Sequence, residues 1–180
     1  MARFALSAIG RDRPGIVAGV SGALLKHGAN IEDSRMAILG GHFTMMLIVS
    51  TPPDADAAAL GRELDETRSR LGLGALTLEE VPDEHGLVRP EASHVVTVYG
   101  ADHPGIVNSV AGALAGMGVN VIDVATHLVE EEGEQSLYAM MMEVELPESV
   151  APDRLEAELR EVAERERLDL SVRAVEAEAL

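Results

Sequence analysis

The chain has 180 residues, no cysteine and a formal net charge of −17. It therefore has no disulfide, no thiolate nucleophile and no cysteine metal site, and its acidity argues against direct binding to nucleic acids. Residues 1–90 hold 9 basic and 12 acidic side chains, a net charge of −3, whereas residues 91–180 hold 5 and 19, a net charge of −14. An acidic surface favours solubility or adaptation to salt or heat, and the alternative is a basic protein partner for the second half.

The beginning of the chain contains few apolar residues before Arg11 and Asp12, which is not typical of a signal peptide. No apolar run approaches the ~20 residues that span a membrane. We therefore expect a cytoplasmic protein.

The first half of the chain alternates strand and helix signals. Pro14 suits the first turn of a helix, Gly28 suits a left-handed helix end, and Gly40 with Gly41 predicts a hairpin turn. In chain order, the expected elements are a strand at 3–9, a helix from Pro14 to the Gly28 stop, strands at 30–39 and 42–50, a helix at 54–71 and a strand at 75–81.

The second half repeats the first. Gly-Arg-Asp-Arg-Pro-Gly-Ile-Val at 10–17 returns as Gly-Ala-Asp-His-Pro-Gly-Ile-Val at 100–107, and Gly-Ala-Asn-Ile-Glu-Asp at 28–33 returns as Gly-Val-Asn-Val-Ile-Asp at 118–123. A repeat of this length indicates duplicated domains. The second copy is expected to contain a strand at 93–99, a helix at 104–117, strands at 120–129 and 136–145, a helix at 152–166 and a strand at 168–175.

Each copy has the order β-α-β-β-α-β, which is the ferredoxin-like pattern. The sequence therefore predicts an α+β protein of two ferredoxin-like domains in tandem, whose antiparallel sheets carry both helices on one face. We expect a first domain at 1–82, a linker at 83–92 and a second domain at 93–180. The linker assignment rests on a polar stretch flanked by Pro82 and Pro90.

The third strand of each copy is apolar on both faces. Met45 and Met46 lie on opposite faces of one strand, and Met140 and Met141 lie on opposite faces of the other. We expect the open sheet face to be covered by another domain or chain. The alternative is that the methionines are adaptable core filler.

The repeated loops combine residues suited to binding a carboxylate. The Pro-Gly pair precedes a helix, whose first N–H groups attract anions, and glycine allows a ligand to approach closely. Asn30 and Asn120 open the next strand, at the far end of that helix, so one domain alone need not bring Gly15 and Asn30 onto one ligand. Two domains side by side could join a loop from one to a strand from the other. Alternatively, Asp12 and Asp102 only cap helices, and the asparagines only bond their local backbone.

Other chemistry is not indicated. The sequence contains no nucleophile elbow, phosphate loop or dinucleotide fingerprint, and its six histidines lack ligand spacing. The acidic run 130–134 is interpreted as a solvated hairpin tip. We therefore expect no enzymatic activity, no catalytic residue, no metal site and no cofactor.

Strand, Asp-Arg-Pro-Gly-Ile-Val, helix, Gly-Ala-Asn-Ile-Glu-Asp and hairpin together resemble the ACT domain, and the two-copy layout is similar to the glycine cleavage system transcriptional repressor group of tandem ACT proteins. The resemblance implies a regulatory protein that binds a small molecule, such as glycine or serine, between paired domains and signals to a protein partner such as a transcription activator or a metabolic enzyme. The alternative is a ligand-free interaction or dimerisation module. The apolar sheet faces favour a homodimer, and the alternative is that the two modules cover each other within one chain. The implied ligand-binding positions are Asp12, Arg13, Pro14, Gly15, Ile16, Asn30 and Ile31, and Asp102, His103, Pro104, Gly105, Ile106, Asn120 and Val121.

Overall fold

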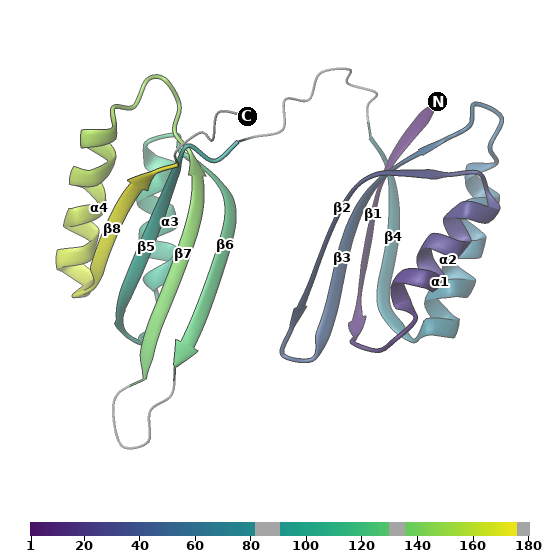
Figure 1. Ribbon diagram of the computed structural model, residues 1–180, viewed down its shortest axis with the longest axis horizontal. Helices are drawn as coiled ribbons and strands as arrows, with labels where there is room; N and C mark the ends of the chain where they lie inside the picture. The colour runs from purple at the N-terminus through teal and green to yellow at the C-terminus, as the bar shows by residue number, and fades with distance from the viewer. Residues whose placement is uncertain (82–90, 130–135, 176–180) are drawn as a thin grey trace. The chain divides into compact units, whose positions relative to one another are not determined.

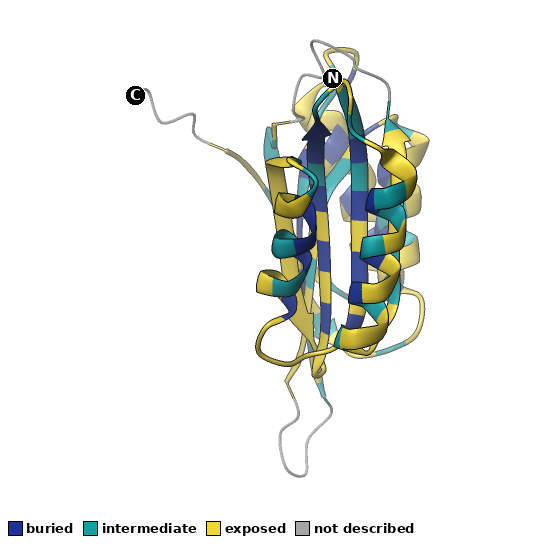
Figure 2. Ribbon diagram, turned by 90° about the vertical axis from the view of Figure 1, so that its right-hand side faces the viewer, coloured by how far each residue is buried: buried dark blue, intermediate teal, exposed yellow. Residues whose placement is uncertain are grey.

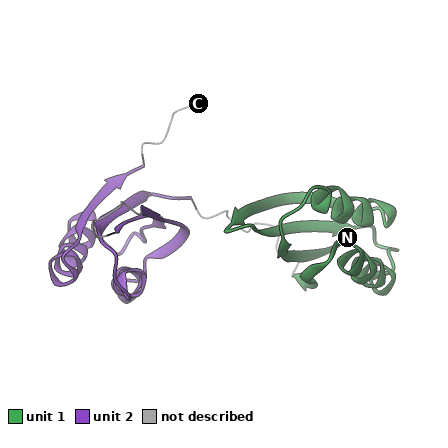
Figure 3. Ribbon diagram, turned by 90° about the horizontal axis from the view of Figure 1, so that it is seen from below, with its two compact units in different colours: residues 1–87 green, residues 88–180 purple. Residues whose placement is uncertain are grey.

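The computed structural model describes residues 1–81, 91–129 and 136–175. The chain divides into two compact units, Met1–Leu87 and Val88–Leu180 (Figure 3), and each unit is described by itself. Most of the expected linker at 83–92 and the acidic run at 130–134 lie outside the described residues, so both assignments stay predictions.

The first unit is a four-stranded antiparallel sheet with two helices on one face (Figure 1). Its strand order, β2-β3-β1-β4, confirms the ferredoxin-like prediction. The elements are β1 (Ala2–Arg11), α1 (Ile16–Lys26), β2 (Asn30–Leu39), β3 (His42–Thr51), α2 (Ala57–Leu71) and β4 (Leu73–Val81).

The second unit repeats this architecture, with strand order β6-β7-β5-β8. The duplication extends to an irregularity, because the pairing register shifts between Ile31 and Asp33 in one unit and between Val121 and Asp123 in the other. The elements are β5 (His94–Ala101), α3 (Ile106–Gly116), β6 (Asn120–Val129), β7 (Leu137–Glu145), α4 (Pro152–Glu166) and β8 (Asp169–Ala174).

The first helix of each unit begins two residues later than predicted. Gly15 and Gly105 are its N-cap residues, with φ angles of 96° and 108°. This left-handed backbone favours glycine and interrupts the helical geometry after the proline. The expected helix at 54–71 also starts late, at Ala57, because the Asp56 carboxylate accepts a hydrogen bond from the Ala59 N–H at 2.9 Å and caps the helix there.

The glycine turns are where the sequence predicts them. Gly28 has a φ of 68° just beyond the end of α1, and Gly40 and Gly41 have φ angles of 55° and 75° in the β2–β3 turn. Two successive positive φ angles match the tight hairpin turn that a Gly-Gly pair favours.

The core of each unit lies between the sheet and its helices, and the alternating burial of the strands is visible in Figure 2. On β3, Phe43, Met45, Leu47 and Val49 are buried. They belong to one cluster with the buried residues of α1 and α2. Burial of each such side chain contributes roughly 1.5–3 kcal/mol. The second core has the same plan, with Met140, Met142 and Val144 on β7 and with buried residues of α3 and α4.

The methionines divide between the two predicted roles. Met45 and Met140 are core filler, at 4% and 1% exposure, whereas Met46 and Met141 lie on the open sheet faces, at 55% and 45% exposure. Beside each exposed methionine, two hydroxyl groups on neighbouring strands form a hydrogen bond across the open face. The pairs are Ser7 with Thr77 at 2.6 Å and Thr97 with Ser171 at 2.9 Å.

The packing of α1 yields a matched pair of substitutions. Replacing Gly22 with alanine should stabilise the chain by about 0.5–1 kcal/mol, because alanine is the better helix former and its Cβ would meet no atom within 4 Å. Gly19→Ala should be less stable than Gly22→Ala, by up to about 1 kcal/mol, because its Cβ would lie 2.9 Å from Leu71 Cδ1 and the leucine side chain would have to shift. Urea unfolding of both variants measures the difference, and equal stabilities would contradict this packing of α1 on α2.

Candidate functional site

The repeated loop between the first strand and first helix is anchored to the sheet. The Asp12 N–H donates to the Gly41 carbonyl at 2.9 Å, and the Asp102 N–H donates to the Ser136 carbonyl at 3.1 Å. Neither aspartate caps the following helix, since α1 and α3 have no side-chain cap hydrogen bond. The capping interpretation of the two aspartates is therefore wrong.

The helix start is open at the position that both loops share. A Cβ built on Gly15 or Gly105 would meet no atom within 4 Å. In α1 the first intrahelical bond runs from the Gly19 N–H to the Gly15 carbonyl at 2.8 Å, so the N–H groups of residues 16–18 precede the ladder. Such a helix start suits a carboxylate.

Two of the predicted ligand contacts have partners within the protein. Arg13 Nη2 donates to the Arg70 carbonyl at 3.1 Å, and His103 Nε2 lies 3.2 Å from the Glu166 carbonyl oxygen. Both carbonyls belong to the last turn of the second helix in the unit, where the helix dipole favours a cation or a donor. Arg13 and His103 thus connect the loop to α2 and α4.

A groove of ≈ 440 Å³ lies beside the loop of the first unit. Asp12 and Arg13, which the sequence predicted, line it together with Arg11. Arg11 and the remaining lining residues, Gly41, Leu71 and Gly72, are not among the positions predicted from the sequence. They come from the β2–β3 turn and the end of α2, so no local signal links them to the loop.

The asparagines lie at the other end of each unit. Asn30 pairs with Ser50, which pairs with Arg3, whereas the loop follows Gly10 at the far end of the same strand. Arg3 and Gly10 lie about 23 Å apart along β1. The Asn30 and Gly15 of one unit are therefore too far apart to contact the same small ligand. Asn30 and Asn120 are exposed, and neither side chain bonds the backbone of the described residues.

The predicted positions also differ in exposure. Asp12, Arg13, Pro14 and Gly15 are exposed, and so are Asp102, Pro104 and Gly105, while His103 is half-buried. Ile16 and Ile106 are each only 2% exposed, so their side chains belong to the cores. Of these two residues, only the backbone N–H groups, which precede the first intrahelical bond, are candidates for ligand contact. Ile31 is 39% exposed and Val121 is half-buried.

Glu166, the last residue of α4, contacts both α3 and the second loop. The Ser109 hydroxyl on α3 donates to Glu166 Oε1 at 2.7 Å, and this hydrogen bond lowers the pKa of Glu166 below its usual value. Because Glu166 also supplies the carbonyl that faces His103, the end of α4 contacts both the loop and α3.

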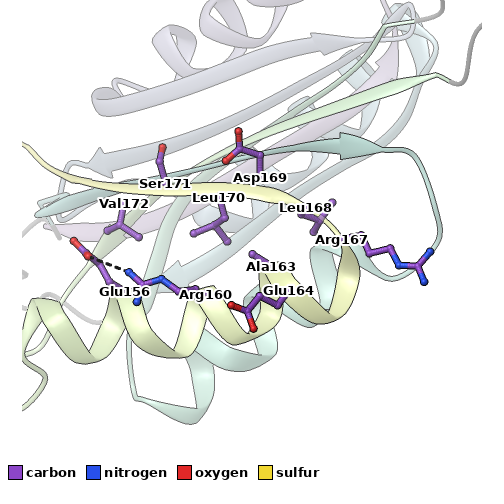
Figure 4. A pocket seen from close by; sticks show the side chains of 10 residues that line it. All are labelled: Glu156, Arg160, Ala163, Glu164, Arg167, Leu168, Asp169, Leu170, Ser171 and Val172. Atoms are coloured by element: carbon purple, nitrogen blue, oxygen red, sulfur yellow. Dashed lines mark ion pairs between the residues drawn. The ribbon is translucent and has the colours of Figure 1, made fainter.

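A second groove, of ≈ 500 Å³, lies between α4 and β8 in the second unit (Figure 4). None of the predicted ligand positions lines it. Within the described ranges, no group of three or more His, Asp or Glu side chains could hold a metal ion, and no helix is long and apolar enough to cross a membrane.

The fold of each unit and the tandem layout recur in known proteins. The profile of the ACT domain matches residues 3–77 and 93–173. The chain belongs to the ACT domain family. A UPF0237 protein of Methanopyrus kandleri is 38% identical over 81 residues, which are 44% of this chain and 90% of that protein. A UPF0237 protein of Pyrobaculum aerophilum is 44% identical over 69 residues, which are 38% of this chain and 77% of that protein.

Two solved structures resemble the whole chain. An unknown protein from Galdieria sulphuraria has a TM-score of 0.79 and 28% identity, over 97% of this chain and 99% of the other. A protein named "putative glycine cleavage system transcriptional repressor" has a TM-score of 0.70 and 20% identity, over 98% of both chains. At that identity the second likeness shows the fold alone, and it agrees with the tandem layout expected from the repeat.

The Ser109–Glu166 hydrogen bond predicts a pH-dependent effect. The bond favours the ionised carboxylate, so its contribution is present above the unfolded-state pKa and is lost as pH falls through the lower folded-state pKa. Ser109→Ala should therefore destabilise the chain near about pH 7 and have little effect near about pH 3.

Urea unfolding at both pH values measures this difference. Ser21→Ala is the control, because the Ser21 hydroxyl donates to the Ala18 carbonyl and to no carboxylate. Its effect should be the same at both pH values. A Ser109→Ala effect that persists unchanged in acid would contradict the assigned cause.

Proposed function

We propose that the protein is a non-catalytic regulator that binds a small amino acid, such as glycine or serine, at the loop-to-helix junctions of its ACT domains and signals to a protein partner. The observation that carries the proposal is the junction itself. In both units a Pro-Gly loop ends in a left-handed glycine, with an open helix start and no side-chain cap.

The junction suits the carboxylate of an amino acid. Its oxygens would accept hydrogen bonds from the first N–H groups of α1 or α3, where the helix dipole is positive. The ammonium group requires an acceptor, and a backbone carbonyl or an asparagine such as Asn30 or Asn120 supplies one. Because Asn30 and Gly15 lie far apart in one unit, the asparagine would come from a second ACT domain, as the resemblance implies.

The two junctions differ in charge. Arg11, Asp12 and Arg13 surround the first, whereas Ala101, Asp102 and His103 occupy the same positions in the second. The extra arginine charge supports stronger carboxylate binding at the first junction.

Signalling through a protein partner follows from the charge of the chain. A net charge of −17 repels nucleic-acid phosphates. Control of transcription would therefore act through a bound activator, and control of metabolism through a bound enzyme. Ligand binding would favour one arrangement of paired domains, which the partner would recognise.

A second candidate function is a ligand-free dimerisation or interaction module. The exposed apolar side chains of the open sheet faces, Ile9 and Met46 in one unit and Tyr99 and Met141 in the other, favour it. Light scattering with and without amino acid separates the two functions. A mass that is the same in both conditions, with no binding in a titration, supports the module.

Thermal unfolding against the twenty amino acids tests the ligand. A ligand that binds only the folded chain stabilises it by about 2.7 kcal/mol at 100 times its dissociation constant. We expect a selective rise in melting temperature with glycine, serine or a close relative. A flat panel would rule out amino-acid binding.

A substitution pair tests the site. Gly15→Ala should weaken binding at the first junction by about tenfold or more, because the methyl group enters the open space and a φ of 96° strains any L residue. Gly40→Ala is the matched control, since it has a positive φ and open space but lies in the hairpin turn. Both variants should lose roughly 1 kcal/mol of stability, and titration calorimetry should show loss of affinity for Gly15→Ala alone. Equal affinities would exclude the junction as the site.

A further inference from the structure

β8 presents an unpaired strand edge. It is the outermost strand of the order β6-β7-β5-β8, so no described strand pairs with its other side. The Asp102 N–H donates to the Ser136 carbonyl, and this pair continues the β5–β7 register. The backbone N–H and C=O groups of the even-numbered β5 residues therefore point toward β7, and those of the odd-numbered residues point toward β8. The odd-numbered β5 residues pair with Asp169, Ser171 and Arg173 of β8. The N–H and C=O groups of Leu170 and Val172 therefore point outward along the free edge.

The edge lies beside the groove of the second unit. Leu168, Leu170 and Val172 line one wall of it, and α4 lines the other with Ala163 and a row of charged residues (Figure 4). In that view, Val172 lies near Glu156 and Leu170 near Arg160, so the strand and the helix run side by side. A half-buried apolar wall next to outward-pointing backbone groups is the geometry that accepts an added strand.

The first unit carries a different residue at the position of Ala163. α2 and α4 each have 15 residues, and Arg68 of α2 occupies the position that Ala163 occupies in α4. Arg68 Nε lies 3.6 Å from Asp65 Oδ1, whereas Ala163 lines the groove. The two units have thus diverged in sequence at this position.

The negative charge of the second half favours a basic partner over a second copy of the chain. The groove is lined by Glu156, Glu164 and Asp169 against Arg160 and Arg167, and residues 91–180 carry a net charge of −14. A second copy of this acidic chain would be repelled, whereas a basic segment would be attracted. An extended segment also gains main-chain hydrogen bonds at the edge, which a folded helix would not.

We propose that the α4–β8 groove binds an extended basic peptide segment of a partner protein, which adds as a strand to β8 through the backbone groups of Leu170 and Val172. Alternate apolar side chains of the segment fill the space beside Ala163, and the basic side chains between them lie near the acidic surface of the unit. The proposal does not depend on amino-acid binding at the loops.

A labelled peptide tests the proposal on the full chain. The probe is a fluorescent Lys-Val-Lys-Val-Lys-Val-Lys heptapeptide, and binding is followed by anisotropy. Two isomeric variants of this peptide serve as a matched pair. One carries a methyl group on the backbone nitrogen of each of its three valines, and the other carries it on the backbone nitrogens of three of its lysines. In an added strand only one set of alternate N–H groups faces β8, so one isomer should bind about tenfold or more weakly and the other within about threefold of the parent. Equal affinities of the two isomers, whether high or low, would overturn the proposal.

A protein variant provides the second arm. Ala163→Arg, which copies the residue of the first unit, should fill the groove and weaken parent-peptide binding by about tenfold or more. Glu158→Gln changes the net charge by the same amount on an exposed residue of α4 outside the groove, and it should retain binding. Circular dichroism verifies the fold of each variant. Equal loss in both variants would show attraction to charge alone and would contradict the groove.

Discussion

The left-handed glycine at the start of the first helix constrains the rest of each unit. Its positive φ turns the chain from the end of β1 or β5 back over the sheet, and the next residue, Ile16 or Ile106, enters the core at once. A residue with a Cβ would be strained there, so the turn and the burial of the isoleucine depend on glycine. The same backbone geometry leaves the first N–H groups of the helix open. One conformational requirement therefore produces both the packing and the proposed ligand junction.

The loop around this glycine is held from both sides. The Asp12 N–H is bonded to the β2–β3 turn, and the Arg13 guanidinium is bonded to the end of α2. In the second unit Asp102 and His103 make the corresponding contacts. A hydrogen bond within a protein replaces one to water, so each contributes only about 0.5–1.5 kcal/mol. Their main effect is to hold the loop in place, because they attach a short irregular segment to two elements that are distant in sequence.

The sequence predicted those features whose causes are local or periodic. The element order follows from alternation and turn glycines, such as Gly40 and Gly41, and the second unit follows from the repeat. The start of α1 was misplaced because Pro14 fits a first helical turn equally well, and only the φ of Gly15 excludes it. The contact of Arg13 with Arg70 spans 57 positions, and a contact of that range leaves no local pattern. The α4–β8 groove could not be predicted for a similar reason, since its lining residues come together only once α4 lies beside β8.

The divergence between the two units is unequal. Both retain the glycine junction, the bulged strand and the paired hydroxyl groups. They differ at Arg13 against His103 in the loop, and at Arg68 against the buried Ala163 on the second helix. The acidic residues are also concentrated in the second half, with a net charge of −14 against −3. Under the two proposals, the loop with Arg11 and Arg13 would suit a carboxylate, and the edge of β8, in the more acidic half of the chain, would suit an extended basic segment. The unequal charges of the two units are what such a division of function would require.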